Sequence, residues 1–101
     1  MIQMQKIRRE MGCSSEDLIR WLPLAMGSYY PSTNLMIDGL AIYVYPEPIA
    51  EIIALTKPSR KIALLNIPVM DISFSFSQEL TISERDELMK RFDLYTRRGG
   101  G

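Results

Sequence analysis

The chain has 101 residues, 47% of them hydrophobic, and its twelve basic residues balance twelve acidic ones. This length and composition predict a single domain with a hydrophobic core of its own. The neutral charge disfavours a nucleic-acid binder, which normally carries a basic excess. Because the chain has no histidine, Ser-His-Asp catalysis and imidazole-bound metals are excluded.

Cys13 is the only cysteine, so the chain cannot form an internal disulfide or a thiolate cluster. A lone cysteine fits a reducing, cytoplasmic location. The predicted helix that follows Cys13 would lower the pKa of its thiol. No histidine or second cysteine can assist it, however, and we expect an incidental residue. No apolar run approaches the roughly 20 residues of a membrane span. We expect no cofactor, no metal and no membrane association.

Two helix-like patterns begin the chain. Residues 1–12 carry Ile7 and Met11 at helical spacing, and we expect a solvated N-terminal segment that is either helical or foreign to the natural chain. Ser14 and Asp17 form a capping-box pair ahead of an apolar stripe, which predicts a helix over 15–26 that ends at Gly27. Pro23 should kink this helix or shorten it.

The middle of the chain predicts strands. Asp-Gly at 38–39 lies between the apolar runs 35–37 and 40–45, which is a strong hairpin signal. Further strands are expected over 49–56 and 61–67, with a turn at 57–60 between them. Residues 69–77 alternate strictly, which indicates a strand with one buried and one polar face. The predicted buried residues of this strand are Met70, Ile72, Phe74 and Phe76.

The last element has the clearest helix signals. Thr81 and Glu84 form a capping-box pair, and Leu88, Phe92 and Tyr95 follow as an apolar stripe. Gly99 should end the helix, leaving residues 99–101 as a flexible glycine tail. The predicted fold is α+β: one small domain over 13–98, ordered helix, four or five mostly antiparallel strands, helix.

Few side chains suggest chemistry. The candidates for anion binding are Lys57, Arg60 and Lys61. A solubilising turn accounts for them better, because no glycine-rich loop leads into a helix N-terminus there to supply backbone N–H groups. Glu51 and Asp71 are the acids expected on the sheet, and without a pocket they are weak candidates for acid-base work. The chain is therefore more readily interpreted as non-catalytic than as an enzyme.

The strands 40–45, 49–55 and 62–65 are apolar on both faces, apart from Glu51, which is the most informative feature of the sequence. Such strands need cover on both sides, so either the two helices divide between the faces or a partner covers one. We expect strands 40–45 and 49–55 to lie away from strand 69–77. A symmetry mate would cover them near Tyr43 or Tyr45.

The predicted function is thus a protein-interaction or self-association module, most simply a homodimer. The alternative is a small-ligand-binding domain with a cavity between sheet and helices. The candidate residues for the interface or ligand are Trp21, Tyr43, Tyr45 and Phe74.

Overall fold

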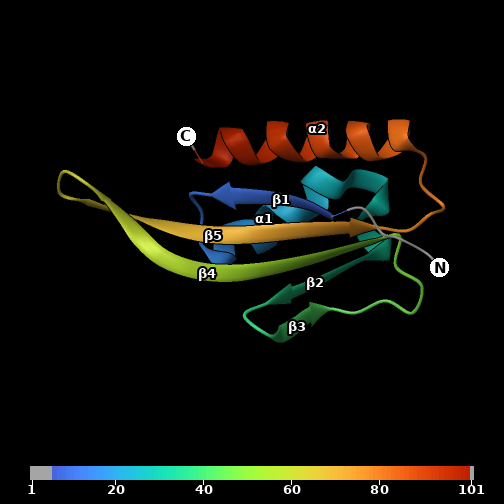
Figure 1. Cartoon of the computed structure of the whole chain (residues 1–101), viewed down its shortest axis with the longest axis horizontal. Coiled ribbons are helices and arrows are strands. Elements are labelled where there is room, and N and C mark those ends of the chain that lie inside the picture. The colour runs from blue at the N-terminus through green and yellow to red at the C-terminus, as the bar shows by residue number, and fades with distance from the viewer. Residues whose placement is uncertain (1–5, 101) are drawn as a thin grey trace.

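A computed structural model describes residues 6–100 of the chain (Figure 1). Its elements are two helices, a short 3₁₀ helix (η1) and five strands, in the order β1 (Lys6–Met11), α1 (Ser15–Met26), η1 (Gly27–Ser32), β2 (Thr33–Ile37), β3 (Leu40–Tyr43), β4 (Ala50–Ile62), β5 (Leu65–Phe76) and α2 (Ile82–Gly100). The predicted fold class is confirmed, with one strand added before the first helix.

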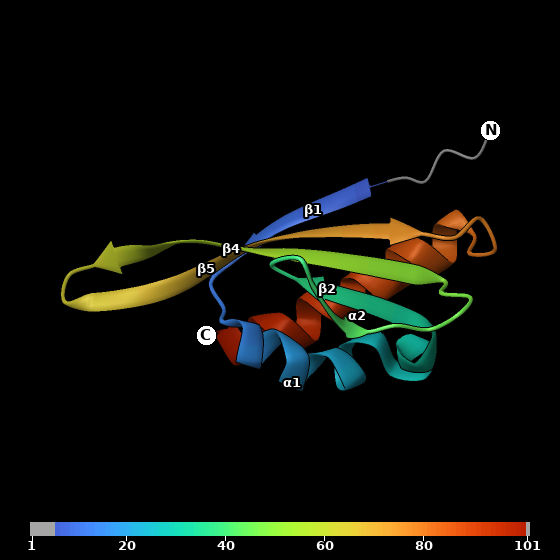
Figure 2. The same ribbon diagram turned by 90° about the horizontal axis from the view of Figure 1, so that it is seen from below.

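The five strands form one mixed sheet in the order β1-β5-β4-β2-β3. β4 and β2 are parallel, and the other neighbouring pairs are antiparallel. Both helices lie on the same face of this sheet (Figure 2). They do not divide between the two faces, so the first of the two possibilities raised by the sequence is wrong and the opposite face has no helix over it.

Capping fixes the N-termini of both helices as the sequence predicts. In α1 the backbone N–H of Asp17 donates to Ser14 Oγ at 3.2 Å, and the Asp17 carboxylate accepts from the Ser14 N–H at 3.2 Å. The helix continues through Pro23 and ends at Gly27, where φ is 58°. In α2 the same exchange joins Thr81 to Glu84.

The core lies between the helices and one face of the sheet. The predicted inward row of β5 is buried throughout, and Phe92 of α2 packs edge-on against Phe74 with ring centroids 4.7 Å apart. Leu88 of the predicted α2 stripe is also buried, whereas Tyr95 is half-buried beneath Arg91. The helix does not end at Gly99 but extends to Gly100, and residue 101 lies outside the described part of the chain.

The predicted break at 57–60 is wrong. β4 runs without interruption from Ala50 to Ile62, and the chain reverses instead at Ala63-Leu64. The pairing register shifts between Lys57 and Arg60, which marks an irregularity around Pro58. Proline lacks an N–H, but it is tolerated at bulges and on strand edges. Pro58 lies beyond the pairing of β2 with β4, so its missing donor disrupts no second ladder.

Two further expectations fail. Residues 6–11 form strand β1 instead of a helix, paired antiparallel with β5 from Lys6↔Ser75 to Met11↔Met70; residues 1–5 lie outside the described part. The prediction that strand 49–55 lies away from strand 69–77 is also wrong, because β4 pairs directly with β5. No helix within residues 6–100 combines the length and apolar character that crossing a membrane requires.

Candidate functional site

The sheet face opposite the helices is half apolar. The apolar half lies on β4 and β2, where Met36 and Ile53 are register partners and Leu55 follows on the same face. Their exposed fractions are 39%, 40% and 48%. Ala41 of β3 pairs with Met36 and extends this surface. These side chains, called the open-face patch below, have no helix over them.

The other half of the same face is polar and internally paired. Asp71 of β5 accepts a hydrogen bond from Arg8 of β1, and Ser73 and Ser75 lie on the same side of β5. Arg60 Nη2 donates to Glu10 Oε1 at 2.8 Å. Because these charges are matched within the chain, the apolar half is the part of the face that lacks cover.

The β4–β5 hairpin extends well beyond the helices and the other strands (Figures 1 and 2). This hairpin arm, residues 57–69, helps to stretch the molecule to 47 × 26 × 23 Å. Its tip is apolar: Leu64 is 101% exposed, Leu65 66% and Ile62 52%. Ala63 adopts φ 56° in the turn, a conformation that costs a non-glycine residue free energy.

One side of the arm continues the uncovered sheet face. Arg60 reaches Glu10, which lies on that face, and Arg60 is paired with Ile67. Two residues further on, Ile62 is paired with Leu65, and the strand period of two places this pair on the same side. The open-face patch and the apolar side of the arm therefore belong to one continuous surface.

A hollow of about 190 Å³ lies on the open face near the beginning of β4. Met36, Ile53 and Val44 give it apolar walls, and Asn34 and Glu51 supply polar atoms. Val44 is 72% exposed. The hollow thus combines apolar lining with one carboxylate.

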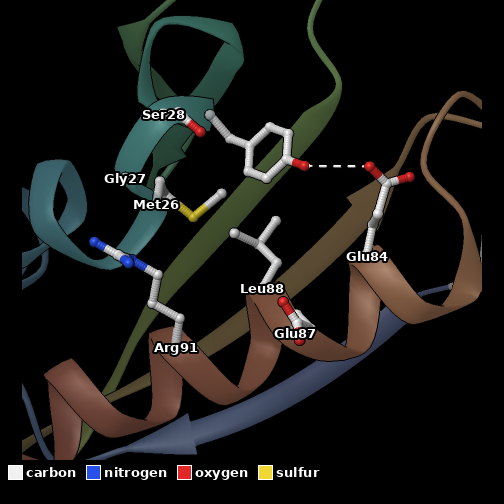
Figure 3. A pocket seen from close by; sticks show the side chains of 8 residues that line it. Met26, Gly27, Ser28, Glu84, Glu87, Leu88 and Arg91 are labelled. Atoms are coloured by element: carbon white, nitrogen blue, oxygen red, sulfur yellow. Dashed lines mark hydrogen bonds between the residues drawn. The ribbon is translucent and has the colours of Figure 1, made fainter.

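A second hollow, of about 280 Å³, lies in the helical layer between η1 and α2 (Figure 3). Tyr29 donates a hydrogen bond to Glu84 Oε2 at 3.4 Å across it. Partial burial and then the Glu84 carboxylate raise the pKa of Tyr29. Arg91 Nε donates to the carbonyl of Leu24 at 3.0 Å, and its guanidinium lies against Gly27 and over Tyr95, 5.0 Å from the ring centroid.

The predicted ligand residues lie in different places. Trp21 and Phe74 are buried in the core on the helix side. Tyr43 lines the open-face hollow and packs edge-on against Tyr30, with ring centroids 5.4 Å apart. Tyr45 lies in the loop after β3, where its backbone N–H donates to Asn34 at 2.7 Å. Neither of the two hollows is lined by Trp21, Tyr45 or Phe74.

The predicted anion-binding residues all lie on the β4 strand of the hairpin arm and are exposed. Arg60 is engaged by Glu10, whereas Lys57 and Lys61 flank it along the strand. Sequence reasoning placed these cations in a turn. It did not foresee that they would stand directly behind an apolar tip, although the run from Lys57 to Leu65 changes from basic to apolar at that point.

Cys13 corrects another expectation. The thiol is fully buried, and burial, followed by the nearby Asp17 carboxylate, raises its pKa to about 11. The helix N-terminus therefore does not activate it. Within residues 6–100, no group of three or more acidic or cysteine side chains is placed to hold a metal ion.

Comparison of the chain with protein-family models, with curated protein sequences and with solved structures finds no match.

Proposed function

We propose that this protein is a non-catalytic self-association module in which two copies pair through the uncovered face of the sheet. The observation that carries the proposal is the open-face patch, where Met36, Ile53 and Leu55 are 39–48% exposed on a regular strand surface. Monomeric proteins rarely leave a large contiguous apolar surface in water. Both helices already pack against the opposite face of the sheet and cannot cover this one.

A second copy of the chain is a suitable cover. In a two-fold contact one patch serves both chains, so a single apolar surface is buried twice. Removing apolar area from water contributes about 25 cal/mol per Å², and a specific interface normally buries more than roughly 1,000 Å² in total. The net charge of zero means that no long-range repulsion opposes the approach of two copies.

Light scattering over a range of protein concentrations tests this proposal. We expect the wild-type chain to be dimeric at micromolar concentration and Ile53→Glu to be monomeric, since it places a charge in the centre of the patch. Leu24→Glu is the matched control, because Leu24 is 61% exposed on α1 in the helical layer. A wild-type monomer at every concentration, or an Ile53→Glu variant as dimeric as the control, would overturn the proposal.

A second candidate function is binding of a small zwitterionic molecule in the hollow of the helical layer. Its lining carries both signs of charge along α2, from Glu84, Glu87 and Arg91, and Tyr29 of η1 lies across from this helix (Figure 3). A ligand with an ammonium and a carboxylate group would match both. A panel of free amino acids should raise the melting temperature of the wild type but not that of Glu87→Gln. An unchanged melting temperature across the panel would eliminate this candidate.

A further inference from the structure

We infer that the hairpin arm of each copy lies over the open face of the other, so that Leu64 enters the hollow beside Glu51 of the second copy. This inference rests on the proposed self-association and specifies how it occurs. It makes the contact reciprocal, with two arms crossing two sheet faces.

The arm needs a cover that its own chain does not provide. A two-stranded ribbon alone is marginally stable in water. β1 pairs with β5 only as far as Met70, and β2 pairs with β4 only as far as Ala54. Beyond these points the two strands of the arm pair with each other alone, and Leu64 at the tip is 101% exposed.

The dimensions fit a reciprocal contact. At about 3.3 Å per residue, the strand from Lys57 to Ile62 spans roughly 20 Å. The part of β4 that pairs with β2, Ala50 to Ala54, spans roughly 16 Å on the same scale. A two-fold axis perpendicular to the strands, passing near the base of the arm, lays each arm along the other copy's β4. The tip then reaches the beginning of that strand, where Glu51 lines the hollow.

The chemistry of tip and hollow also matches. An apolar cavity of about 150 Å³ can hold a benzene molecule, so the hollow of about 190 Å³ has room for a leucine side chain. Its walls include Met36, Val44 and Ile53, and the incoming side of the arm carries Ile62 and Leu65. Apolar surface thus faces apolar surface in both halves of the contact.

Charge favours a second copy over other occupants. The arm carries three basic residues and no acidic one, so the rest of this neutral chain has nine basic residues against twelve acidic ones. Glu51 is absent from the ion pairs formed among the described residues, and it is 2 residues from Ile53 in the patch. Lys57 lies at the base of the arm and Lys61 lies on the side opposite Ile62. The attraction is therefore between the basic arm as a whole and the acidic remainder of the second copy.

Leu64→Glu tests the role of the arm without disturbing the fold, because the Leu64 side chain is fully exposed. The matched control is Leu94→Glu, at a residue 57% exposed on α2. We expect Leu64→Glu to weaken dimerisation at least tenfold in sedimentation analysis and Leu94→Glu to leave it unchanged. If Leu64→Glu dimerises like the wild type while Ile53→Glu does not, the arm inference is overturned and the proposed self-association stands.

A comparison of the two sides of the arm tests which surface meets the open face. Ile62→Glu places a charge on the side that continues the open face, whereas Lys61→Glu places one on the opposite side of the same strand. We expect Ile62→Glu to weaken dimerisation about tenfold and Lys61→Glu to leave it nearly unchanged. Equal effects of the two variants would show that the arm does not meet the second copy through its Ile62 side.

The remaining occupant to distinguish is a lipid surface, because an apolar tip backed by cations also suits an anionic bilayer. Flotation with vesicles of phosphatidylserine and phosphatidylcholine should leave the wild-type protein unbound. A wild-type monomer that floats with these vesicles, and loses this binding in Leu64→Glu, would overturn both the arm inference and the proposed self-association.

Discussion

Replacing Phe92 by alanine tests the core arrangement most directly. The Phe92 side chain is fully buried on α2 and contacts Phe74 of β5 edge-on, with ring centroids 4.7 Å apart. Truncating a buried phenylalanine costs about 3–5 kcal/mol, because transfer free energy is lost and a cavity remains. The aromatic contact accounts for about 0.5–1.5 kcal/mol of the loss.

This loss is large for a domain of this size. Unfolding free energies are usually about 5–15 kcal/mol, and each kcal/mol lowers the melting temperature of a 60–100-residue domain by about 4–8 °C. We therefore expect Phe92→Ala to melt about 15–30 °C below the wild type. Urea denaturation followed by circular dichroism, at one protein concentration for all variants, measures the free-energy change.

Leu94→Ala provides the comparison within the same helix, because Leu94 is 57% exposed. Its effect should stay within about 0.5 kcal/mol. If Leu94→Ala destabilised the protein more than Phe92→Ala, the face of α2 that packs on the sheet would be wrongly assigned. Equal effects would mean that α2 is not docked through Phe92.

Three further predictions concern the thiol, the β2–β3 turn and the cap of α2. Cys13, whose pKa is raised to about 11 by burial, should react with iodoacetamide at pH 8 only after denaturation, and rapid labelling of the native protein would refute its burial. Hydrogen bonds from Thr56 lower the pKa of Asp38, so the stabilising effect of its carboxylate is present above the ordinary carboxyl pKa and is lost as pH falls through the folded value. Asp38→Asn should therefore make the free energy of unfolding less dependent on pH in the acid range, and an unchanged acid profile would contradict this. Thr81→Ala removes the hydroxyl that accepts from the Glu84 N–H and should cost about 1 kcal/mol in urea denaturation, whereas no loss would show that the cap is not formed in solution.

The elements that could be predicted from the sequence are those whose signals are local. The capping pair Ser14–Asp17 and the turn at Asp38-Gly39 depend on residues that are neighbours in the chain. The turn has φ values of 50° and 82°, as its residue types favour. Strand β5 was equally clear, because a period of two is visible without knowing its neighbours.

The elements that could not be predicted depend on pairing across the chain. Residues 6–11 show helical spacing, yet β5 offers an antiparallel partner for each of them, and this pairing overrides the local pattern. Pro58 and Pro68 look like strand breaks, but both lie where the adjoining strand has already ended. Their missing N–H groups therefore disrupt no outer ladder.

The candidate site was partly visible in the sequence. The apolar character of both faces of strand 49–55 correctly indicated an uncovered apolar surface, because Ile53 and Leu55 face away from the helices. The position of that surface could not be deduced, since it depends on the strand order. The open-face hollow was also hidden, because it joins Val44, Asn34 and Glu51 from three separate segments.

The distribution of polar residues on β5 explains why the helices leave this surface open. On its other face β5 carries Asp71, Ser73 and Ser75, and a helix packed there would have to cover polar groups. Both helices therefore pack against the Phe74 side, where every inward residue of β5 is apolar. The apolar residues of β4 share the open face with this polar row, with Ile53 opposite Ser73 and Leu55 opposite Asp71. Ile53 and Met36 therefore remain exposed as a consequence of where β5 directs the helices. In the proposed dimer the arm of the second copy covers the apolar half, and a two-stranded arm is narrower than a pair of helices, so it can lie along β4 without burying the polar groups of β5.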